Sequence, residues 1–90
     1  KNIALIIFLI DIRHLPSEND RLMYDYVVRS GRPFIILANK ADKIAITKVE
    51  NSVEDLQNAL NPLHDFVFLP FSSERKIYSD NVWKQIELYL

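Results

Sequence analysis

Three short polar segments of the sequence each follow an apolar stretch, and the second of them has side chains suited to selective recognition. This segment, Asn39-Lys40-Ala41-Asp42, comes directly after the apolar run Phe34–Leu37. A carboxylate such as that of Asp42, held in a dry pocket, can accept two parallel hydrogen bonds from adjacent N–H groups of a ligand. A ligand without these donors leaves the buried carboxylate unpaired, at a cost on the order of 1–3 kcal/mol. The segment therefore predicts a site that selects ligands by their hydrogen-bond donors.

The order Asn39, Lys40 and Asp42 matches the Asn-Lys-x-Asp pattern with which GTPases recognise guanine. Guanine offers a ring N–H beside an exocyclic amino group, and adenine has no such pair. In this interpretation Asn39 ties the loop to its neighbours and the aliphatic stem of Lys40 lies along the base. The third polar segment begins with Ser72 and Ser73, whose backbone N–H groups are expected to meet the 6-oxo group. The predicted guanine-binding residues are Asn39, Lys40, Asp42, Ser72 and Ser73.

The first polar segment contains Asp11, Arg13 and His14, and it allows a different hypothesis. An aspartate that ends a buried strand is also the position of phosphoacceptors in receiver and haloacid-dehalogenase proteins. The phosphatase version expects a second aspartate where this chain has Arg13, and a receiver expects further acidic metal ligands near the start of the chain. We therefore expect an Asp11–Arg13 ion pair with a structural role, and His14 partly exposed in a loop. An Asp11 phosphoacceptor is the less favoured alternative.

The chain has one glycine, Gly31, and this count excludes two kinds of nucleotide site from it. A Walker phosphate loop needs two glycines, and a dinucleotide-binding fingerprint needs three, because only glycine lets the backbone N–H groups approach phosphate closely. The chain also has no cysteine and no spacing of residues that is typical of a metal site. We expect no catalytic residue and no metal ligand in this chain.

The polar segments alternate with apolar ones in a way that predicts a parallel sheet covered by helices. Strands are expected at residues 3–10, 34–37 and 66–69, the first of them as a central strand, and a helix is expected after each. The order βαβαβα describes an α/β fold in three layers. Ligands of such sheets bind outside the carboxyl ends of the strands, which is where all three polar segments lie. One domain, residues 1–90, is therefore predicted.

Each predicted helix has a start signal and an apolar face. The first begins with a capping-box-like Ser17 and Asp20 and ends at Gly31. Its expected buried face consists of Leu22, Met23, Tyr26 and Val27. The second is expected to be capped by Thr47 with Glu50 and to end at Asn61-Pro62, with a buried face of Val49, Val53, Leu56 and Leu60. The third begins near Asp80 and is expected to bury Val82, Trp83, Ile86, Tyr89 and Leu90.

Composition excludes further classes of function. Eleven lysine and arginine residues against twelve aspartate and glutamate residues give a net charge of −1, so the chain lacks the excess of basic charge that dedicated nucleic-acid-binding and membrane-surface proteins carry. No apolar run approaches the roughly 18 residues of a membrane span. We expect neither DNA nor a membrane as partner. The chain begins at Lys1, and the apolar run at residues 3–10 needs a neighbour, so we expect the chain to be a fragment.

Four ordered segments make the chain resemble the carboxyl-terminal half of the EngB (YihA/YsxC) family of ribosome-assembly GTPases. The segments are Asp11-x-Arg13-His14 with Pro16 and Asp20, Lys40 to Lys43, Phe71 to Ser73, and Asp80 to Trp83. Two positions depart from the family pattern. Asn39 stands where the family usually has Thr, which restores the general GTPase pattern, and Ile77 to Ser79 occupy a stretch where the family tends to have a glycine.

The resemblance implies the carboxyl-terminal half of a P-loop GTPase (Ras-like) domain that takes GTP or GDP as its ligand. It implies a cytoplasmic protein that binds a large ribosomal subunit or its assembly intermediate and is needed for normal cell division. The phosphate loop and the Mg²⁺ motif would precede Lys1, so Mg²⁺ is expected only in the full-length protein. This chain alone should not hydrolyse GTP, since phosphoryl transfer depends on positioning the phosphates and Mg²⁺. A non-enzymatic α/β module that binds RNA or protein is the alternative.

Overall fold

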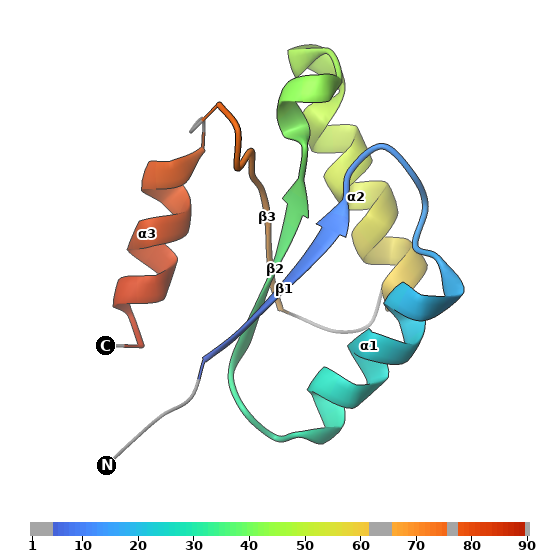
Figure 1. Cartoon of the computed structure of the whole chain (residues 1–90), viewed down its shortest axis with the longest axis vertical. Coiled ribbons are helices and arrows are strands. Elements are labelled where there is room, and N and C mark those ends of the chain that lie inside the picture. The colour runs from blue at the N-terminus through green and yellow to red at the C-terminus, as the bar shows by residue number, and fades with distance from the viewer. Residues whose placement is uncertain (1–4, 62–65, 76–77, 90) are drawn as a thin grey trace.

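Strands alternate with helices along the chain, as the sequence predicts (Figure 1). The computed structural model describes residues 5–61, 66–75 and 78–89. The strands are β1 (Ile6–Asp11), β2 (Phe34–Asn39) and β3 (Val67–Pro70). The helices are α1 (Glu18–Arg29), α2 (Val49–Leu60) and α3 (Ser79–Glu87), and two short 3₁₀ turns, η1 (Ala41–Lys43) and η2 (Ile46–Lys48), connect β2 to α2. The predicted strand residues 3 and 4 lie outside the described residues.

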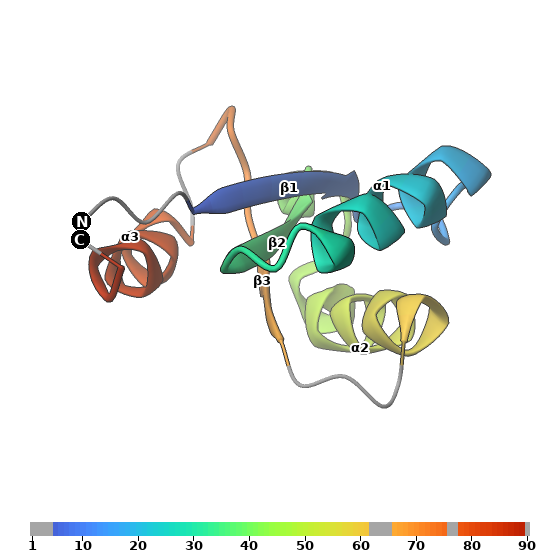
Figure 2. The same ribbon diagram turned by 90° about the horizontal axis from the view of Figure 1, so that it is seen from below.

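The three strands form one parallel sheet in the order β1-β2-β3. Helices α1 and α2 cover one face and α3 covers the other, which confirms the three-layer α/β architecture (Figure 2). Strand β2 runs two residues beyond the predicted 34–37, because its pairing with β1 continues to Asp11 and Asn39. The last residue of β2 is therefore one of the predicted site residues.

The middle strand of the sheet in this chain is β2, whereas the first strand, predicted to be central and to need a neighbour beside it, lies at an edge of the described sheet. Ile36 and Ala38 of β2 pack toward α1 and α2, whereas Ile35 and Leu37 pack toward α3. All four side chains are at most 3% exposed. Among the described residues strand β1 is paired on one side, with β2, and its Ile7 and Leu9 are 44% and 52% exposed. The continuous apolar sequence of β1 therefore does not mean that both faces of this strand are buried in this chain.

Helix α1 begins and ends as predicted, but it buries a different face. The Ser17 Oγ accepts a hydrogen bond from the Asp20 N–H (3.1 Å), and the Asp20 carboxylate accepts one from the Ser17 N–H (3.0 Å). Gly31 follows the helix with a φ of 70°, a left-handed conformation that glycine adopts without strain. The buried side chains are Tyr24 and Val27. Of the four residues predicted to be buried, Val27 is confirmed, whereas Leu22, Met23 and Tyr26 are exposed.

The physical reason is that α1 has two overlapping apolar stripes, and tertiary contacts choose between them. Tyr24 lies one turn from Val27 and Val28, and its ring packs edge-on against Phe34 and at a tilt against Phe66. This aromatic cluster joins α1 to residues near the starts of β2 and β3. Periodicity along α1 alone does not contain that information.

Helix α2 buries its predicted face but begins differently. Val49 and Leu56 are buried, and Val53 and Leu60 pack against the same core. The predicted cap at Thr47 is wrong, since Thr47 lies inside η2 and the residue that precedes α2 is Lys48, without a side-chain capping bond. The η2 turn supplies the entry into α2, and its Lys48 N–H donates to the Ala45 carbonyl (2.9 Å). Asn61 ends α2 in an extended conformation, and Pro62 lies outside the described residues.

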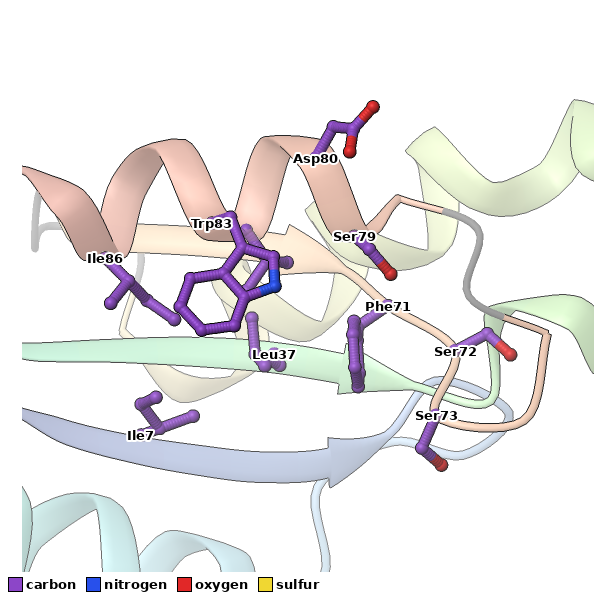
Figure 3. A pocket seen from close by; sticks show the side chains of 10 residues that line it. Ile7, Leu37, Phe71, Ser72, Ser73, Ser79, Asp80, Trp83 and Ile86 are labelled. Atoms are coloured by element: carbon purple, nitrogen blue, oxygen red, sulfur yellow. The ribbon is translucent and has the colours of Figure 1, made fainter.

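Helix α3 begins within one residue of the predicted position and leaves a groove beside the sheet. Val82 is buried, and Ile86 and Tyr89 pack against the same cluster as Ile35 and Leu37. The predicted burial of Trp83 is wrong, because this side chain is 58% exposed. Its ring lies along a groove of about 570 Å³ between α3 and the strands, opposite Ile7 (Figure 3). Leu90 lies outside the described residues.

The two helix starts lead to a test of capping. Replacing Ser17 by Ala removes the side-chain acceptor at the start of α1 and should lower the free energy of unfolding by about 1 kcal/mol. Replacing Thr47 by Ala removes the same kind of group where the structure has no cap, and should change that free energy by less than about 0.5 kcal/mol. Urea unfolding followed by circular dichroism measures both. Equal losses in the two variants would contradict the assignment of the caps.

Candidate functional site

The three polar segments lie together at the carboxyl edge of the sheet, as the sequence predicts. Asp11 ends β1 and Asn39 ends β2, and the two residues are partners in the parallel register. Backbone hydrogen bonds then continue beyond the strands: the Ile12 N–H donates to the Asn39 carbonyl (2.9 Å) and the Ala41 N–H to the Phe71 carbonyl (3.0 Å). The loops that follow the strands are therefore held side by side by main-chain contacts.

Lys40 turns the chain back toward β3. Its φ of 67° and ψ of 31° are left-handed, which is uncommon for a residue with a side chain. The Lys40 carbonyl accepts a hydrogen bond from the Lys43 N–H (2.9 Å), and this closes the η1 turn. As a result, Asp42 lies against the loop after β3, whereas the Lys40 side chain extends toward β1. The left-handed backbone of Lys40 thus sends the Asp42 side chain toward the loop after β3 and the Lys40 side chain toward β1.

The Asp42 carboxylate is held by Ser72, thirty residues further along the chain. The Ser72 hydroxyl donates a hydrogen bond to Asp42 Oδ1 (2.8 Å) and accepts one from the Arg75 N–H (3.0 Å). Ser72 is fully buried, and the Asp42 side chain is only 7% exposed. Because the hydroxyl is engaged on both sides, it fixes the direction of Oδ1.

The surroundings of Asp42 favour its charged form. The hydrogen bond from Ser72 is the main cause that lowers the pKa of Asp42 below its ordinary value, and burial opposes this shift. A hydrogen bond from the backbone and the positive charges of Lys43 and Arg75 lower the pKa further. Asp42 therefore offers an ionised, oriented acceptor at neutral pH, which is the chemistry that a donor pair on a ligand requires.

Asn39 provides a second link from the end of β2 to the loop after β3. Its Oδ1 accepts a hydrogen bond from the Ser73 N–H (3.2 Å). This contact confirms the prediction that Asn39 ties the loop to its neighbours. It also means that the Ser73 N–H already has an acceptor, and a 6-oxo group would have to share or replace it. The predicted contacts of Ser72 and Ser73 with such a group stay a prediction.

Lys43 and Glu74 also belong to this edge, although neither was predicted as a site residue. The Lys43 ammonium lies 3.7 Å from Asp42 Oδ2 and 3.3 Å from Glu74 Oε1. It therefore balances two carboxylates on two different loops. Both residues are solvent-exposed charges in polar loops, and only the return of η1 to the loop after β3 places them together.

The ion pair predicted between Asp11 and Arg13 is present. Arg13 Nη2 and Nε lie 2.9 and 3.1 Å from the two oxygens of the Asp11 carboxylate, and the Arg13 backbone N–H donates to Oδ1 (2.9 Å). The bonds from the Arg13 side chain are the main cause that lowers the pKa of Asp11 to about 2. His14 is exposed, as expected. Since Arg13 occupies both oxygens, this geometry gives no support to the alternative of an Asp11 phosphoacceptor.

The five predicted site residues line three neighbouring hollows rather than one pocket. Asp42 lines a hollow of about 190 Å³ with Arg75 and Tyr78. Asn39 and Lys40 line another, of about 210 Å³, together with Asp11. The Ser72 and Ser73 side chains lie at one end of the groove beside α3 (Figure 3). The structure thus brings the five residues to one edge, where Asn39 meets Ser73 and Asp42 meets Ser72, while Lys40 turns toward Asp11.

Residues 5–61, 66–75 and 78–89 contain no group of three or more histidine, aspartate or glutamate side chains placed to hold a metal ion. None of the helices in these ranges combines the length and the hydropathy that crossing a membrane requires.

The parallel sheet with helices on its two faces matches the carboxyl-terminal half of a P-loop GTPase domain of the Ras-like kind, and the Asn-Lys-x-Asp segment lies at the end of its middle strand. The chain is 38% identical over 85 residues to a probable GTP-binding protein EngB of Lachnospira eligens, which is 94% of this chain and 40% of the relative. It is 38% identical over 88 residues to the EngB of Lachnoclostridium phytofermentans and 37% identical over 82 residues to that of Listeria monocytogenes.

The resemblance to EngB is thereby confirmed. The match covers 91–98% of this chain and corresponds to the carboxyl-terminal part of the relatives. The chain spans 40–44% of the length of these curated relatives. No family model matches the chain.

The bond between Ser72 and Asp42 can be tested by titration. Replacing Ser72 by Ala removes the main cause of the lowered pKa of Asp42, so this pKa should rise toward its ordinary value. In the matched variant Ser73→Ala the backbone N–H that serves Asn39 remains, and the pKa of Asp42 should stay where it is. Carbon-13 NMR titration of the Asp42 carboxyl measures both. An unchanged pKa in Ser72→Ala would contradict the described geometry.

Asp11 should make stability depend on pH at the acidic end. Its pKa is about 2 in the folded protein and 3.8 without partners, so the unfolded state binds the proton more readily. The stabilisation from Arg13 is therefore complete above about pH 4 and is lost as the pH falls toward about 2. At about pH 6, Arg13→Met should lower the free energy of unfolding by about 0.5–1 kcal/mol, as is usual for partly exposed pairs. Urea unfolding at several pH values between about 2 and 6 measures the free energy of unfolding of both proteins. The difference between them should vanish toward about pH 2. A difference that is the same at every pH would contradict the ion pair.

Proposed function

We propose that residues 1–90 form the guanine-recognition half of the GTPase domain of an EngB-type protein. Two lines support this. The relatives are named GTP-binding proteins and match this chain over nearly its whole length. The Asn-Lys-x-Asp segment lies at the carboxyl edge of a parallel sheet, which is the edge where such sheets bind their ligands. Under this proposal the ligand is GTP or GDP.

The observation that carries the proposal is the state of Asp42. This carboxylate is almost completely removed from solvent, ionised, and aligned by the Ser72 hydroxyl. The Ser72 hydroxyl and a backbone N–H use part of the acceptor capacity of this carboxylate, and guanine offers two further donors in parallel through its ring N–H and its exocyclic amino group. Adenine would leave the same carboxylate facing an acceptor, which disfavours adenine nucleotides.

The other predicted residues have supporting roles in this proposal. Asn39 joins the loops after β2 and β3 through the Ser73 N–H, so the base would meet a prearranged surface. Lys40 covers one face of the base with its aliphatic stem. Ser72 orients Asp42, and the N–H groups of Ser72 and Ser73 lie on the side of the 6-oxo group.

Catalysis belongs to the rest of the domain. GTPases position the phosphates and Mg²⁺ with a phosphate loop and an acidic motif, and a chain with a single glycine cannot contain that loop. When bound, Mg²⁺ would neutralise the charge that develops on the phosphates. The full-length protein would thus be a GTPase, and these 90 residues would select its nucleotide. We further propose, by resemblance to EngB, that it binds a large ribosomal subunit intermediate in the cytoplasm and supports cell division.

A second candidate function rests on the groove beside α3. Its exposed Trp83, together with Ile7, would suit a module that binds RNA or protein without nucleotide. Dependence on the nucleotide separates the two candidates. If a ribosomal component binds equally well with GDP, with a GTP analogue and with neither, the interaction module is favoured.

Asp42→Asn in the full-length protein tests guanine recognition. An amide accepts one hydrogen bond and donates another, so it complements the ring N–H and the 2-oxo group of xanthine. The affinity for GDP should fall by roughly 5- to 150-fold, corresponding to about 1–3 kcal/mol. The affinity for xanthosine diphosphate should rise. Isothermal titration calorimetry with both nucleotides measures the change.

The matched control is Asp25→Asn, which removes the same charge from an exposed position on α1. Both affinities should remain those of the unchanged protein. An Asp42→Asn variant that keeps its preference for guanine would overturn the proposal.

A further inference from the structure

A charged contact joins the first polar segment to the predicted guanine site. Lys40 Nζ lies 3.8 Å from Asp11 Oδ2, across the ends of two paired strands. From the sequence these residues have separate predicted roles, Lys40 as the lysine that covers the base and Asp11 in a structural ion pair. Because Asp11 and Asn39 are register partners, the residue after Asn39 starts beside the Asp11 carboxylate.

Asp11 is a rigid partner rather than a mobile surface charge. Arg13 binds it through two side-chain nitrogens and the backbone N–H, at 2.9–3.1 Å. These three bonds span only two residues of sequence and orient the carboxylate within its own turn. A side chain that docks on such a group does not have to order its partner as well.

Lys40 by contrast has a long side chain that needs a partner to hold it in one direction. Its side chain is 49% exposed, and four rotatable bonds connect its ammonium group to the backbone. Its left-handed backbone sets only where the side chain starts. Since a free lysine stem samples many rotamers, covering a flat base would require it to lose most of them.

We infer that Asp11, oriented by Arg13, is a positioning residue that holds the Lys40 side chain across the carboxyl edge of the sheet, where its stem covers the guanine base. This inference rests on the proposed function. Asp11 itself does not touch the base; it acts through Lys40. The hollow that Asp11, Asn39 and Lys40 share is the place at which this arrangement is built.

The test is a double-mutant cycle in the full-length protein, with GDP as the ligand. Asp11→Asn should weaken GDP binding about 2- to 5-fold, since exposed pairs of this kind contribute little individually. Lys40→Met keeps the stem and removes the ammonium group, so adding Asp11→Asn to it should change the affinity no further. Arg13→Gln removes the bonds that orient the Asp11 carboxylate, so it should also weaken GDP binding. This effect should disappear when Lys40 is replaced by Met. Asp25→Asn is the charge-matched control and should leave GDP affinity unchanged.

A second measurement reports on the side chain directly. NMR relaxation of the Lys40 ε-methylene group without nucleotide should show restricted motion in the unchanged protein and faster motion in Asp11→Asn. A purely structural role of Asp11 would leave this motion as it was. If Asp11→Asn disturbs folding, Asp11→Glu provides the second variant, because it keeps the charge and should retain the restricted motion.

The outcomes separate the inference from the proposed function. The inference would be overturned if Asp11→Asn weakened GDP binding equally in the unchanged protein and in the Lys40→Met variant, because Asp11 would then act independently of Lys40. Unrestricted motion of Lys40 in the unchanged protein would overturn it as well. Absence of GDP binding, or retained guanine preference in Asp42→Asn, would instead count against the proposed function, and the relaxation measurement would still decide whether Asp11 holds Lys40.

Discussion

Strand β2 is paired on both edges and buried on both faces, and the other features of this protein depend on that double constraint. Its backbone groups are satisfied by β1 and β3, and its side chains alternate between two separate cores. A shift of one residue would exchange the residues that face α1 and α2 with those that face α3. The register is therefore strongly specified. With it, Asn39 is brought beside Asp11, and the chain leaves β2 at a defined point.

The register also sets the arrangement of the polar residues at the carboxyl edge of the sheet, through a few hydrogen bonds and ion pairs. The left-handed Lys40 sends Asp42 to one side, where Ser72 receives it, and its own side chain to the other, where Asp11 lies. Buried polar groups at this edge are paired: the Ser72 hydroxyl both donates and accepts. The result is an edge that is arranged before any ligand arrives, which reduces the cost of ordering it on binding.

Helix features that depend on residues close together in the chain agree with their predictions. The capping box of α1, the stop at Gly31 and the buried face of α2 were correct, because each depends on residues within one or two turns of one another. Three of the four residues on the predicted face of α1, the cap at Thr47 and the burial of Trp83 were wrong. The aromatic cluster at Phe34 and Phe66 selected the buried face of α1, and the groove beside α3 leaves Trp83 exposed. At Thr47 the local η2 turn took the place of a side-chain cap.

The sequence by itself determined the α/β order, the parallel sheet and the candidate site residues, since periodicity, breakers and a four-residue pattern are all local properties. Only the tertiary structure decided that β2 is central, that Ser72 orients Asp42, and that Lys40 turns toward Asp11. These contacts join positions 29 or 30 residues apart. They exist because the strands align their carboxyl ends and the backbone reverses at Lys40, and no local pattern encodes that alignment.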